Sequence, residues 1–598
     1  MRLDNIRLPN LSLRRKIVST VLIITSLAVY IFSWAYILES ARSLGGWDRN
    51  LSKALRSLRW EDALQYWQLF VIHVAALGLL LIPTYSLFCE TSFNRRFRFV
   101  VIAIALLCVG SDVALWLLAP YAKEKNIYLG IVGLLTACPL LLFTCTPLVQ
   151  MWWYRRWRSP TGKPIRVVVV GGGFAGLYAA MGLNKKLGYN HDLELTLLDR
   201  RNYFLFPPLL PSAAAGTIET RQVSFPFRRI FETTNIAFRK VSVSEIDPRA
   251  GIVRGVIEVS TDPQTGERIE RETIQPYDYL VFAPGSSNQT YDVPGVERYA
   301  FFMRELNDAV VLRNHVINCF ERAAVMLDED ARREMLSFVI VGGGPTGVET
   351  ASELYDLIEN ILLKRYPEIP PNLPQVTIMQ SGSQILAGWS PEIVAMTRNQ
   401  LEKMGIEVRL GMRVSKVGAH SVQAGNVSLQ TRTVVWTAGV KPSPLAARSG
   451  LELHSCGRIE VQEDCRARGY DNIFVLGDVA HYIDPRTRKA LPPLGQVAFQ
   501  QGTHTAKNLV RLLSGKGTKP FRYFNFGGLV SVGEHFAAVN LLGVTLSGFV
   551  GWFVWRTLYL FKLVGFGNKV RVVLDWTLDL VLERSISQIR DERERLER

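Results

Sequence analysis

Two glycine-rich turns, each placed between an apolar strand and a helix, constrain the fold of this chain more than any other feature. The first, in IRVVVVGGGFAGLYAAMGL, carries Gly171, Gly173 and Gly176, and the second, in FVIVGGGPTGVETASEL, carries Gly342, Gly344 and Gly347. An all-apolar strand indicates a parallel sheet that is covered on both faces. The glycines permit a tight turn, the close approach of a pyrophosphate to a helix N-terminus, and close helix–strand packing. The sequence therefore predicts an α/β protein with two Rossmann-like dinucleotide-binding units.

Residues that follow later strands support this interpretation. The strand LELTLLD ends in Asp199, at the distance expected for a carboxylate that binds a ribose hydroxyl. Two such units in one chain predict two dinucleotides held face to face, a tightly bound FAD in the first and a diffusing nicotinamide in the second. A turn in NIFVLGDVAH presents Gly477 and Asp478, which suits the ribityl–phosphate part of FAD. The alternative, a glycine turn in an unliganded α/β domain, stays open.

The N-terminal quarter of the chain is apolar. Four runs, 17–38, 63–88, 99–120 and 127–149, each reach the ~20 residues that a membrane-spanning helix needs. They predict an all-α four-helix transmembrane domain over residues 1–158, with the core helices of a soluble bundle as the alternative. Basic clusters in the flanks place the rest of the chain in the cytoplasm, or in the equivalent compartment that contains NAD(P)H. His73 and Asp112 lie near the middle of the second and third runs. They would pair or serve a proton or quinone path, but interhelical hydrogen bonding in a membrane anchor is the favoured interpretation.

Charge and cysteine content exclude some classes of function. The net charge is +16, but no basic run interleaved with aromatic residues indicates nucleic-acid binding, and contact with anionic lipid explains the charge more simply. The seven cysteines form no CxxC pair and show no zinc or iron–sulfur spacing. We therefore expect no metal site and no disulfide framework.

The soluble portion, about 164–580, resembles the type II NAD(P)H:quinone oxidoreductases, the single-subunit, non-pumping NADH dehydrogenases. The stretches that carry the resemblance include LLDRRNYFLFPPLLPSAAAG, YDYLVFAPGSSN, VVWTAGVKPSPL, IFVLGDVAH and LPPLGQVAFQQGTHTAKNL. The resemblance implies oxidation of NADH or NADPH and reduction of a membrane quinone through FAD, without proton pumping. The N-terminal helices are not part of that pattern, and a membrane complex bound through them, or a homodimer, stays open.

The resemblance also implies a division into domains and a set of site residues. FAD would be bound by 164–300 and 436–520, NAD(P)H by 301–435, and the membrane by 521–598. FAD contacts fall on Gly171, Gly173, Phe174, Ala175, Gly176, Asp199, Arg200, Gly285, Gly477, Asp478, Gly495 and Gln496. NAD(P)H contacts fall on Gly342, Gly344, Pro345, Thr346, Gly347, Glu349, Gln380 and Gly439. The catalytic candidates are Glu349, Gln496 and Gln500.

Three of these positions depart from the family pattern. Gly495 stands where the quinone motif A-Q-x-A-x-Q begins with alanine, and Pro284 stands in APGS where A-T-G is usual. Gln380 ends the strand QVTIMQ, where members that prefer NADH have an acid. A carboxylate there would repel the 2′-phosphate of NADPH, so its absence predicts that NADPH is accepted.

The catalytic candidates also have plain structural interpretations. Gln496 and Gln500 can bind quinone carbonyl oxygens without carrying charge into an apolar tunnel, but helix capping and packing are the alternative. Glu349 can handle a proton or the nicotinamide, or it can simply favour the N-terminal end of its helix dipole.

The C-terminal run LSGFVGWFVWRTLYLFKLVGF, Leu546 to Phe566, is dense in aromatic residues and carries only Arg556 and Lys562 as charges. It predicts an interfacial helix whose Trp and Tyr side chains lie at headgroup depth while the basic residues extend to water. A fifth membrane-spanning helix is the rival interpretation.

Two other functions compete with the quinone reductase hypothesis. A sulfide:quinone reductase-like enzyme would need redox cysteines beside the flavin, and Cys319, Cys456 and Cys465 do not lie in such contexts. A non-catalytic or sensory flavoprotein subunit of a larger membrane complex would explain the N-terminal helices, but not the retained glutamines and Glu349.

Overall fold

The computed structural model describes residues 164–187, 192–232, 234–261 and 268–578 of the 598-residue chain. Most of these residues belong to one compact unit built from Ile165–Leu183, Glu194–Phe231 and the described part of Ile236–Arg598. The four apolar runs predicted to span a membrane, and with them His73 and Asp112, lie outside the described residues.

The first glycine turn follows strand β1 in a five-stranded sheet. Its strands, in spatial order, are β21 (Ile473–Val475), β9 (Tyr279–Phe282), β1 (Ile165–Val170), β2 (Leu193–Asp199) and β5 (Ile236–Lys240). The pairs β1–β9, β2–β5 and β9–β21 are parallel. Val167, Val168 and Val169 of β1 are at most 1% exposed, because the strand is covered on both faces. Helix α6 (Phe174–Leu187) begins directly after the turn.

The second glycine turn lies in a sheet in which four of the five strands have the same connectivity. Its order is β11 (Ala300–Phe302), β18 (Thr433–Trp436), β12 (Ser337–Val341), β13 (Gln375–Gln380) and β14 (Glu407–Leu410), and all its pairs are parallel. The remaining edge strand, β11, precedes the glycine strand instead of coming last in the chain as β21 does. In both sheets the chain leaves the edge strand, β5 or β14, and forms a three-stranded antiparallel meander. It then returns to pair with the strand that precedes the glycine turn, β1 or β12. The repeat seen in the two turns therefore extends over whole folding units.

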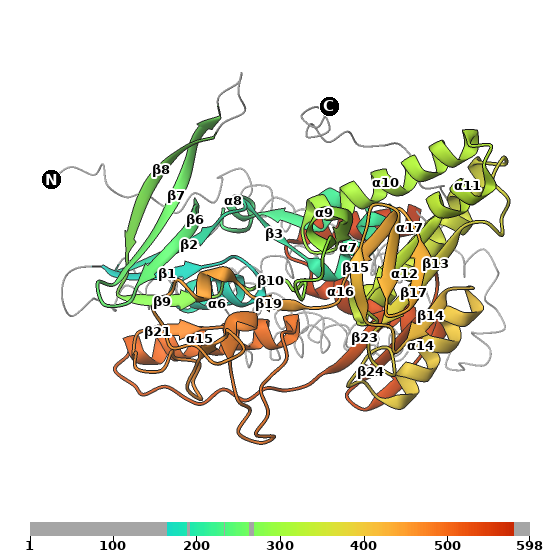
Figure 1. The fold of residues 1–598 in the computed structure, drawn as a ribbon. Helices are drawn as coiled ribbons and strands as arrows, with labels where there is room; N and C mark the ends of the chain where they lie inside the picture. The colour runs from blue at the N-terminus through green and yellow to red at the C-terminus, as the bar shows by residue number, and fades with distance from the viewer. Residues whose placement is uncertain (1–163, 188–191, 233, 262–267, 579–598) are drawn as a thin grey trace, which may run out of the picture. The chain divides into compact units, whose positions relative to one another are not determined.

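Six smaller sheets complete the strand structure of the described residues. The two meanders are β6 (Ser242–Asp247), β7 (Ile252–Thr261) and β8 (Arg268–Pro276), and β15 (Val414–Val417), β16 (Ser421–Ala424) and β17 (Val427–Gln430). Strands β7 and β8 form the long green hairpin at the upper left of Figure 1. A later meander comprises β23 (Gly527–Ser531), β24 (Ala537–Leu541) and β25 (Val544–Leu546). The two-stranded sheets pair β3 (Tyr203–Leu205) with β4 (Ser224–Pro226), β10 (Ser286–Asn288) with β19 (Val440–Pro442), and β20 (Ile459–Glu460) with β22 (Ala480–His481).

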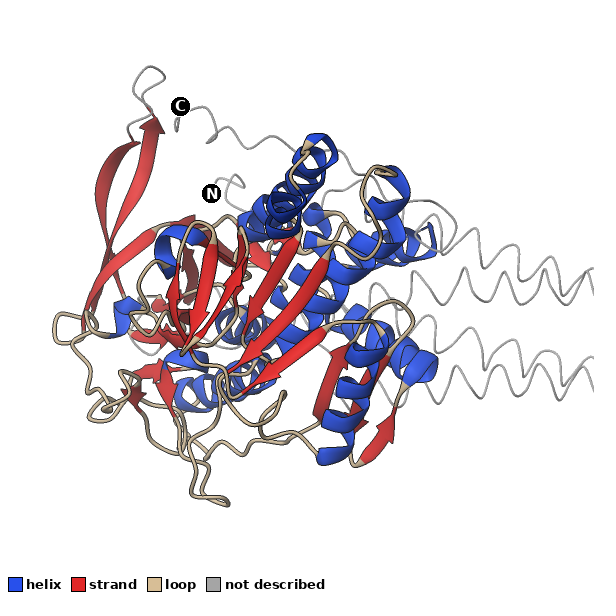
Figure 2. Ribbon diagram, turned by 45° about the vertical axis from the view of Figure 1, so that its right-hand side comes forward, coloured by secondary structure: helices blue, strands red, loops and turns tan. Residues whose placement is uncertain are grey.

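Helices cover the faces of the parallel sheets (Figure 2). Besides α6, the helices of the described residues are α7 (Leu210–Ala214), α8 (Phe227–Ile230), α9 (Val296–Tyr299), α10 (Leu306–Val325), α11 (Glu329–Met335), α12 (Pro345–Leu357), α13 (Leu363–Arg365), α14 (Pro391–Lys403), α15 (Gly495–Leu513), α16 (Gly548–Lys562) and α17 (Phe566–Leu578). Helix α12 occupies in the second unit the place that α6 occupies in the first.

The C-terminal run Leu546 to Phe566 forms one helix, α16, as predicted, and a second helix, α17, follows it. Helix α16 ends at Lys562, and Gly565, with φ +83°, turns the chain into α17. Within the described residues, no helix is both long and apolar enough to cross a membrane.

The orientation of the side chains in α16 corrects the prediction that its Trp and Tyr side chains lie at headgroup depth while its basic residues extend to water. Trp552, Trp555 and Tyr559 are buried, between 4% and 9% exposed, and do not project outward. Arg556 does not extend away from the helix either, because its guanidinium carbon lies 3.8 Å from the ring centre of Trp552 and 4.9 Å from that of Trp576. The large apolar residues that α16 exposes are Phe549, Val550, Phe553 and Phe561.

Candidate active site

The first glycine turn has the backbone geometry of a phosphate-binding turn. Gly171 has φ +94°, which favours glycine, and its N–H donates to the Leu198 carbonyl at 2.8 Å. A Cβ on Gly176 would lie 1.9 Å from the Gly171 carbonyl oxygen, so only glycine lets α6 approach β1. A Cβ on Gly173 would meet nothing within 4 Å. Open space thus adjoins the N-terminus of α6, which carries no acidic residue in its first turn, and an anionic pyrophosphate fits there.

Asp199 braces this turn from the end of β2. Its carboxylate accepts from the Gly172 N–H at 2.6 Å and from the Arg201 N–H at 2.7 Å. Arg200 forms an ion pair with Glu305, and Glu305 also pairs with Arg201 at 3.0 Å. The structure therefore brings Asp199 to the glycine turn, while Arg200 is directed toward the start of α10.

The second glycine turn repeats this geometry. Gly342 has φ +112° and donates to the Met379 carbonyl at 2.8 Å, and a Cβ on Gly347 would lie 1.9 Å from the Gly342 carbonyl oxygen. Gly344 caps α12 and again has open space around its missing Cβ. Pro345 follows at the first helical position, which needs no N–H donor, and Thr346 comes next. The brace is now neutral, since Gln380 Oε1 accepts from the Gly343 N–H at 2.9 Å.

A two-stranded ribbon joins the two units near their glycine turns. A Cβ on Gly171 would contact the Ala283 carbonyl at the end of β9, and one on Gly342 would contact Thr437 at the end of β18. Gly285 and Gly439 follow these strand ends, with φ of +74° and +139°. From there the chain enters β10 and β19, which pair antiparallel. Both predicted glycines therefore lie where the ribbon leaves its sheet.

Asp478 lies beside this ribbon. Gly477, with φ +74°, begins the turn, and the Asp478 carboxylate accepts from the Ser286 hydroxyl in β10. Arg304 donates to both oxygens of Ser286, to Oγ at 2.9 Å. From the sequence, Ser286 was assigned no role although it stands in the APGS stretch, and Arg304 was missed because no motif marks it.

Gln501 is the other residue that the sequence analysis missed. It is 1% exposed, and its Oε1 accepts from the Gly477 N–H at 2.7 Å. Its position directly after Gln500 was visible in the sequence, but one residue turns it to a different face of α15. The helix thus presents one glutamine to the Asp478 turn and two to a different partner.

Gln496 and Gln500 both bind the backbone of the segment 524–527. Gln496 Nε2 donates to the Gly527 carbonyl at 3.0 Å and Oε1 accepts from Phe526 N–H at 3.4 Å. Gln500 Nε2 donates to the Phe524 carbonyl at 2.8 Å and Oε1 accepts from Phe524 N–H at 3.0 Å. Each amide keeps one N–H and one lone pair for a ligand. The two glutamines therefore hold Phe524 and Phe526, which are 53% and 38% exposed, at the start of β23.

Gly495 is the first residue of α15 and faces the first glycine turn. A Cβ there would lie 3.2 Å from the Phe174 ring, and Phe174 in turn packs edge-on against Phe204 and Phe206. A Cβ on Gly477 would contact Ala175 at 3.5 Å. Five of the residues predicted to bind FAD, Phe174, Ala175, Gly176, Gly477 and Gly495, thus meet where α6 and α15 begin.

Glu349 lies in the second unit, two residues beyond the third glycine. It is 6% exposed, and its Oε1 accepts from the Ser531 N–H at 3.2 Å, at the end of β23 opposite to the Gln496 contact. Burial raises the pKa of Glu349 to about 8, an effect that nearby Glu353 reinforces and the Ser531 N–H opposes. One short strand therefore contacts both Gln496 and Glu349.

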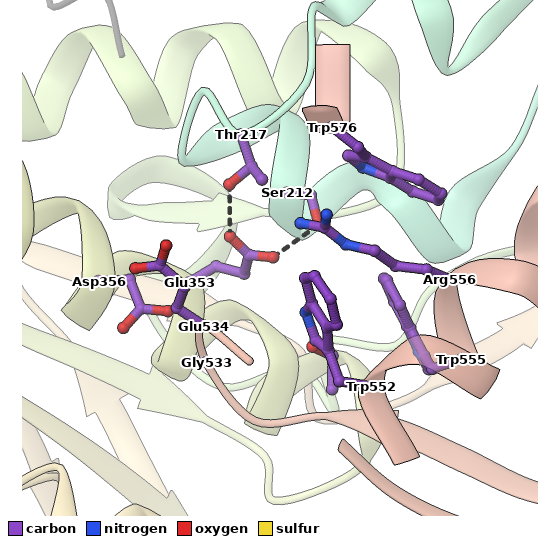
Figure 3. A pocket seen from close by; sticks show the side chains of 11 residues that line it. Ser212, Thr217, Glu353, Asp356, Gly533, Glu534, Trp552, Trp555, Arg556 and Trp576 are labelled. Atoms are coloured by element: carbon purple, nitrogen blue, oxygen red, sulfur yellow. Dashed lines mark hydrogen bonds between the residues drawn. The ribbon is translucent and has the colours of Figure 1, made fainter. Parts of the chain in front are cut away.

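A small pocket lies one helical turn further along α12 (Figure 3). Glu353 accepts from Ser212 Oγ at 2.6 Å and from Thr217 Oγ1 at 2.8 Å. Figure 3 shows Asp356 and Glu534 on the same side as Glu353, and Arg556 with Trp552 and Trp576 across from them. The acidic groups of α12 are thus enclosed by the C-terminal helices.

The fold and the paired glycine turns define a class, the oxidoreductases that bind two dinucleotides. The family model described as pyridine nucleotide-disulphide oxidoreductase matches residues 165–502. The chain is 32% identical to a probable NADH dehydrogenase of Dictyostelium discoideum, over 72% of this chain and 93% of that protein. It is 30% identical to the type II NADH:quinone oxidoreductase Ndh of Mycobacterium tuberculosis, over 71% of this chain and 91% of that protein.

A solved structure shares the fold. NDH2 from Plasmodium falciparum in complex with NADH superposes with a TM-score of 0.64 at 19% identity, over 71% of this chain and 100% of that chain. The chain belongs to the pyridine nucleotide-disulphide oxidoreductase family and, within it, to the type II NADH dehydrogenases.

Proposed function

We propose that this protein oxidises NAD(P)H and reduces a membrane quinone through FAD, without pumping protons. The observation that carries the proposal is the pair of equivalent glycine turns in one compact unit, joined by the β10–β19 ribbon. FAD, when bound, would supply a group that accepts hydride from NAD(P)H and returns two electrons to a quinone.

The first unit would hold FAD. Open space at Gly173 in front of α6 accommodates the pyrophosphate, and Asp199 holds the turn in shape from β2. Asp478, fixed by Ser286, is placed to bind the ribityl–phosphate part. Phe174 and Gly495 bring the N-termini of α6 and α15 together beside it.

The second unit would hold NADH or NADPH. Gly344 leaves the same open space in front of α12, and Gln380 braces the turn without a charge. A neutral amide accepts a hydrogen bond from a ribose hydroxyl and does not repel a 2′-phosphate. The neutral brace therefore supports the use of both cofactors.

Glu349 would hold a proton between the two units. Because the pKa of this carboxyl is raised to about 8, it stays protonated at neutral pH and can release that proton when a neighbouring group becomes more basic. The Ser531 N–H stabilises the charged form that remains. The acid thus supplies protons from a position enclosed by α12, β23 and α16.

Gln496 and Gln500 would shape the quinone entrance by holding the segment 524–527. That segment presents Phe524 and Phe526 to the surface, and apolar rings suit a lipid-dissolved substrate. The remaining N–H of each amide is available to a quinone carbonyl. We infer that the main role of the two glutamines is to position the entrance, and that quinone binding is their additional role.

The exposed apolar side chains of α16 and α17 would rest on the bilayer. Phe549, Phe553, Phe561 and Leu574 are between 54% and 63% exposed. Helices with such a face bind at the interface of a membrane. The predicted N-terminal helices would add an integral anchor that leaves the dinucleotide sites facing the NAD(P)H-containing compartment, and a surface for other membrane subunits.

A half-reaction experiment tests the proposal. The full chain, reconstituted in liposomes, is mixed anaerobically with NADH or NADPH, and flavin bleaching is followed by stopped flow; a soluble quinone is then added. We expect bleaching by both donors, recovery by quinone, and no pH change inside the liposomes. Absence of bleaching by either donor would reject the enzyme hypothesis, and internal acidification would reject the non-pumping one.

A further inference from the structure

Three metal-ligating side chains outside the glycine turns come together in the fold. His454, Cys456 and His481 each offer one ligand atom, and these atoms lie within 4.8 Å of one another. We propose that these residues form a binding site for a transition-metal ion of the zinc class.

The three side chains lie near one another, but their ligand atoms are not arranged as a tetrahedron. His454 Nδ1 lies 3.0 Å from Cys456 Sγ, and the rings of His454 and His481 stack with centroids 3.7 Å apart. Bond lengths of 2.0–2.1 Å to nitrogen and 2.3 Å to sulfur set ligand atoms ~3.5 Å apart around zinc. His454 Nδ1 also accepts from the Cys456 N–H at 3.2 Å. Rotation of the His454 ring would unstack the two imidazoles and bring all three residues onto one ion.

The backbone brings the ligands together from two segments. His454 and Cys456 lie in a turn closed by hydrogen bonds from His454 N–H to Arg458 O at 2.7 Å and from Gly457 N–H to His454 O at 2.8 Å. The turn leads into β20, and β20 pairs with β22 so that Glu460 stands opposite His481. The cysteine spacing predicted no metal site, because it shows no paired cysteines. The third ligand, His481, is distant in the sequence and comes close only through strand pairing.

A buried ring nitrogen that makes no hydrogen bond points to a missing ligand. His481 is 8% exposed, and its Nδ1 makes no hydrogen bond within the described part of the chain. That atom lies 3.3 Å from Glu460 Oε1 without the alignment of a hydrogen bond. A metal would resolve this in either orientation of the ring: Nδ1 binds the ion, or Nε2 binds it while Nδ1–H turns to the carboxylate, as metal-bound histidines commonly do.

The ligand chemistry selects the metal. Two imidazoles and one thiolate suit zinc and similar borderline-soft ions, whereas magnesium and calcium take oxygen ligands. Three protein ligands leave a fourth position for water or for Glu460. Cys456 is exposed, so an ion can enter from solvent. Occupation would tie the 454–457 turn to β22, which directly follows the Asp478 turn.

Metal analysis of the full chain, produced without a histidine tag, tests the proposal. After dialysis against low zinc we expect one zinc per chain, and Cys456→Ser and His454→Ala should each weaken zinc affinity at least 100-fold in competition with a chelating dye. Both residues lie on a turn, so the variants should fold, and their thermal unfolding verifies it. Cys319→Ser, which removes a buried thiol elsewhere, is the matched control and should bind zinc as the wild type does.

Cobalt supplies an independent readout. Co²⁺ added to the wild type should give a thiolate-to-cobalt charge-transfer band that is absent from Cys456→Ser and present in Cys319→Ser. Equal zinc affinity in wild type and Cys456→Ser, or no thiolate band in the wild type, would overturn the proposal. Neither measurement requires NAD(P)H or quinone, so its outcome is separate from that of the proposed enzymatic function.

Discussion

The two dinucleotide units have the same backbone design but different surroundings. In each, the first glycine N–H donates to the second strand at 2.8 Å, and the side chain that ends that strand accepts from the N–H of the next residue, Gly172 or Gly343. The brace is charged in one unit, Asp199, and neutral in the other, Gln380. The same hydrogen-bond pattern thus accepts a charged or a neutral brace. In the proposed function the backbone of each turn would bind phosphate and the brace would meet the ribose.

The helices that follow the turns differ more. Counting from the first glycine, Tyr178 of α6 is equivalent to Glu349 of α12, and Gly182 is equivalent to Glu353. A Cβ on Gly182 would lie 2.8 Å from Ala506, so glycine lets α15 pack against α6. The acids of α12 instead face β23 and α7. Helix α6 thus serves as a packing surface for α15, and α12 carries the buried ionisable groups.

The largest effects are expected from the middle glycine of each motif. Gly173→Ala and Gly344→Ala place a methyl group in space that is open in the protein, so the fold should remain while the pyrophosphate loses room. We expect Gly173→Ala to lose FAD and all activity. Gly344→Ala should keep its flavin absorbance but weaken NAD(P)H binding ~100-fold, about 2.7 kcal/mol.

Flavin content and stopped-flow bleaching distinguish these outcomes. Gly176→Ala and Gly347→Ala serve as controls for steric damage, because their methyl groups would collide with backbone oxygens 1.9 Å away and should lower the unfolding temperature. Loss of flavin in Gly344→Ala would show that the ligands are assigned to the wrong units.

Glu349→Gln tests the difference between the two helices. Between its usual pKa of 4.5 and the raised value of about 8, the carboxyl is protonated in the native state and ionised in the unfolded one, so wild-type stability falls as pH rises. The amide removes this penalty, and its unfolding temperature should gain on that of the wild type across the same range.

Activity gives the second readout for Glu349. We expect flavin content to be kept, turnover to fall roughly 100-fold, the lower end of what a positioned acid contributes, and a pH–rate inflection near 8 to disappear. Tyr178→Phe, the equivalent position on α6, should leave that inflection unchanged. An unaltered inflection in Glu349→Gln would remove Glu349 from the proton path.

Variants of the three glutamines on α15 distinguish quinone reduction from flavin binding. Gln496→Ala and Gln500→Ala each remove two hydrogen bonds to the segment 524–527, each worth about 1 kcal/mol. We expect quinone reduction to slow ~10-fold while flavin reduction by NADH stays within twofold. Gln501→Ala, which frees the Gly477 N–H, should instead weaken flavin retention. If Gln496→Ala slowed both half-reactions equally, the glutamines would be purely structural.

These cases show how far the sequence alone reaches. The strand–glycine–helix repeats predicted the turns, because the allowed φ of glycine and the contacts of a Cβ are local properties. The partners of Gln496 and Gln500 could not be predicted, since they depend on where residues 524–527 return to α15. Ser286 and Arg304 were missed for the same reason. The inward rotation of Trp552 and Arg556 was also unpredictable, because the acidic pocket that they close is assembled from α7, α12 and β23.

The two braces can be interchanged chemically. Gln380→Glu should keep the hydrogen bond from Gly343 N–H and add a negative charge next to the ribose, so kcat/KM for NADPH should fall ~10-fold relative to NADH, about 1.4 kcal/mol. Asp199→Asn is the reciprocal change; it keeps an acceptor for Gly172 N–H and should weaken FAD binding without altering donor preference. A strong preference for NADH in the wild type that Gln380→Glu leaves unchanged would contradict the neutral-brace argument.

The smallest effect is expected at Gly495, where the two flavin-side helices meet. Gly495→Ala restores the alanine of the family motif and adds a methyl group 3.2 Å from the Phe174 ring. A Gly→Ala change in a helix stabilises by up to about 1 kcal/mol, while the tight contact opposes it, so thermal unfolding should change little. Flavin content should be unchanged if Phe174 can tilt between Phe204 and Phe206, as edge-on rings allow. Loss of flavin would instead show that the Phe174 ring cannot move, so that the first unit requires glycine at 495. The second unit has no such requirement, because the space around Gly344 is open and its brace is neutral.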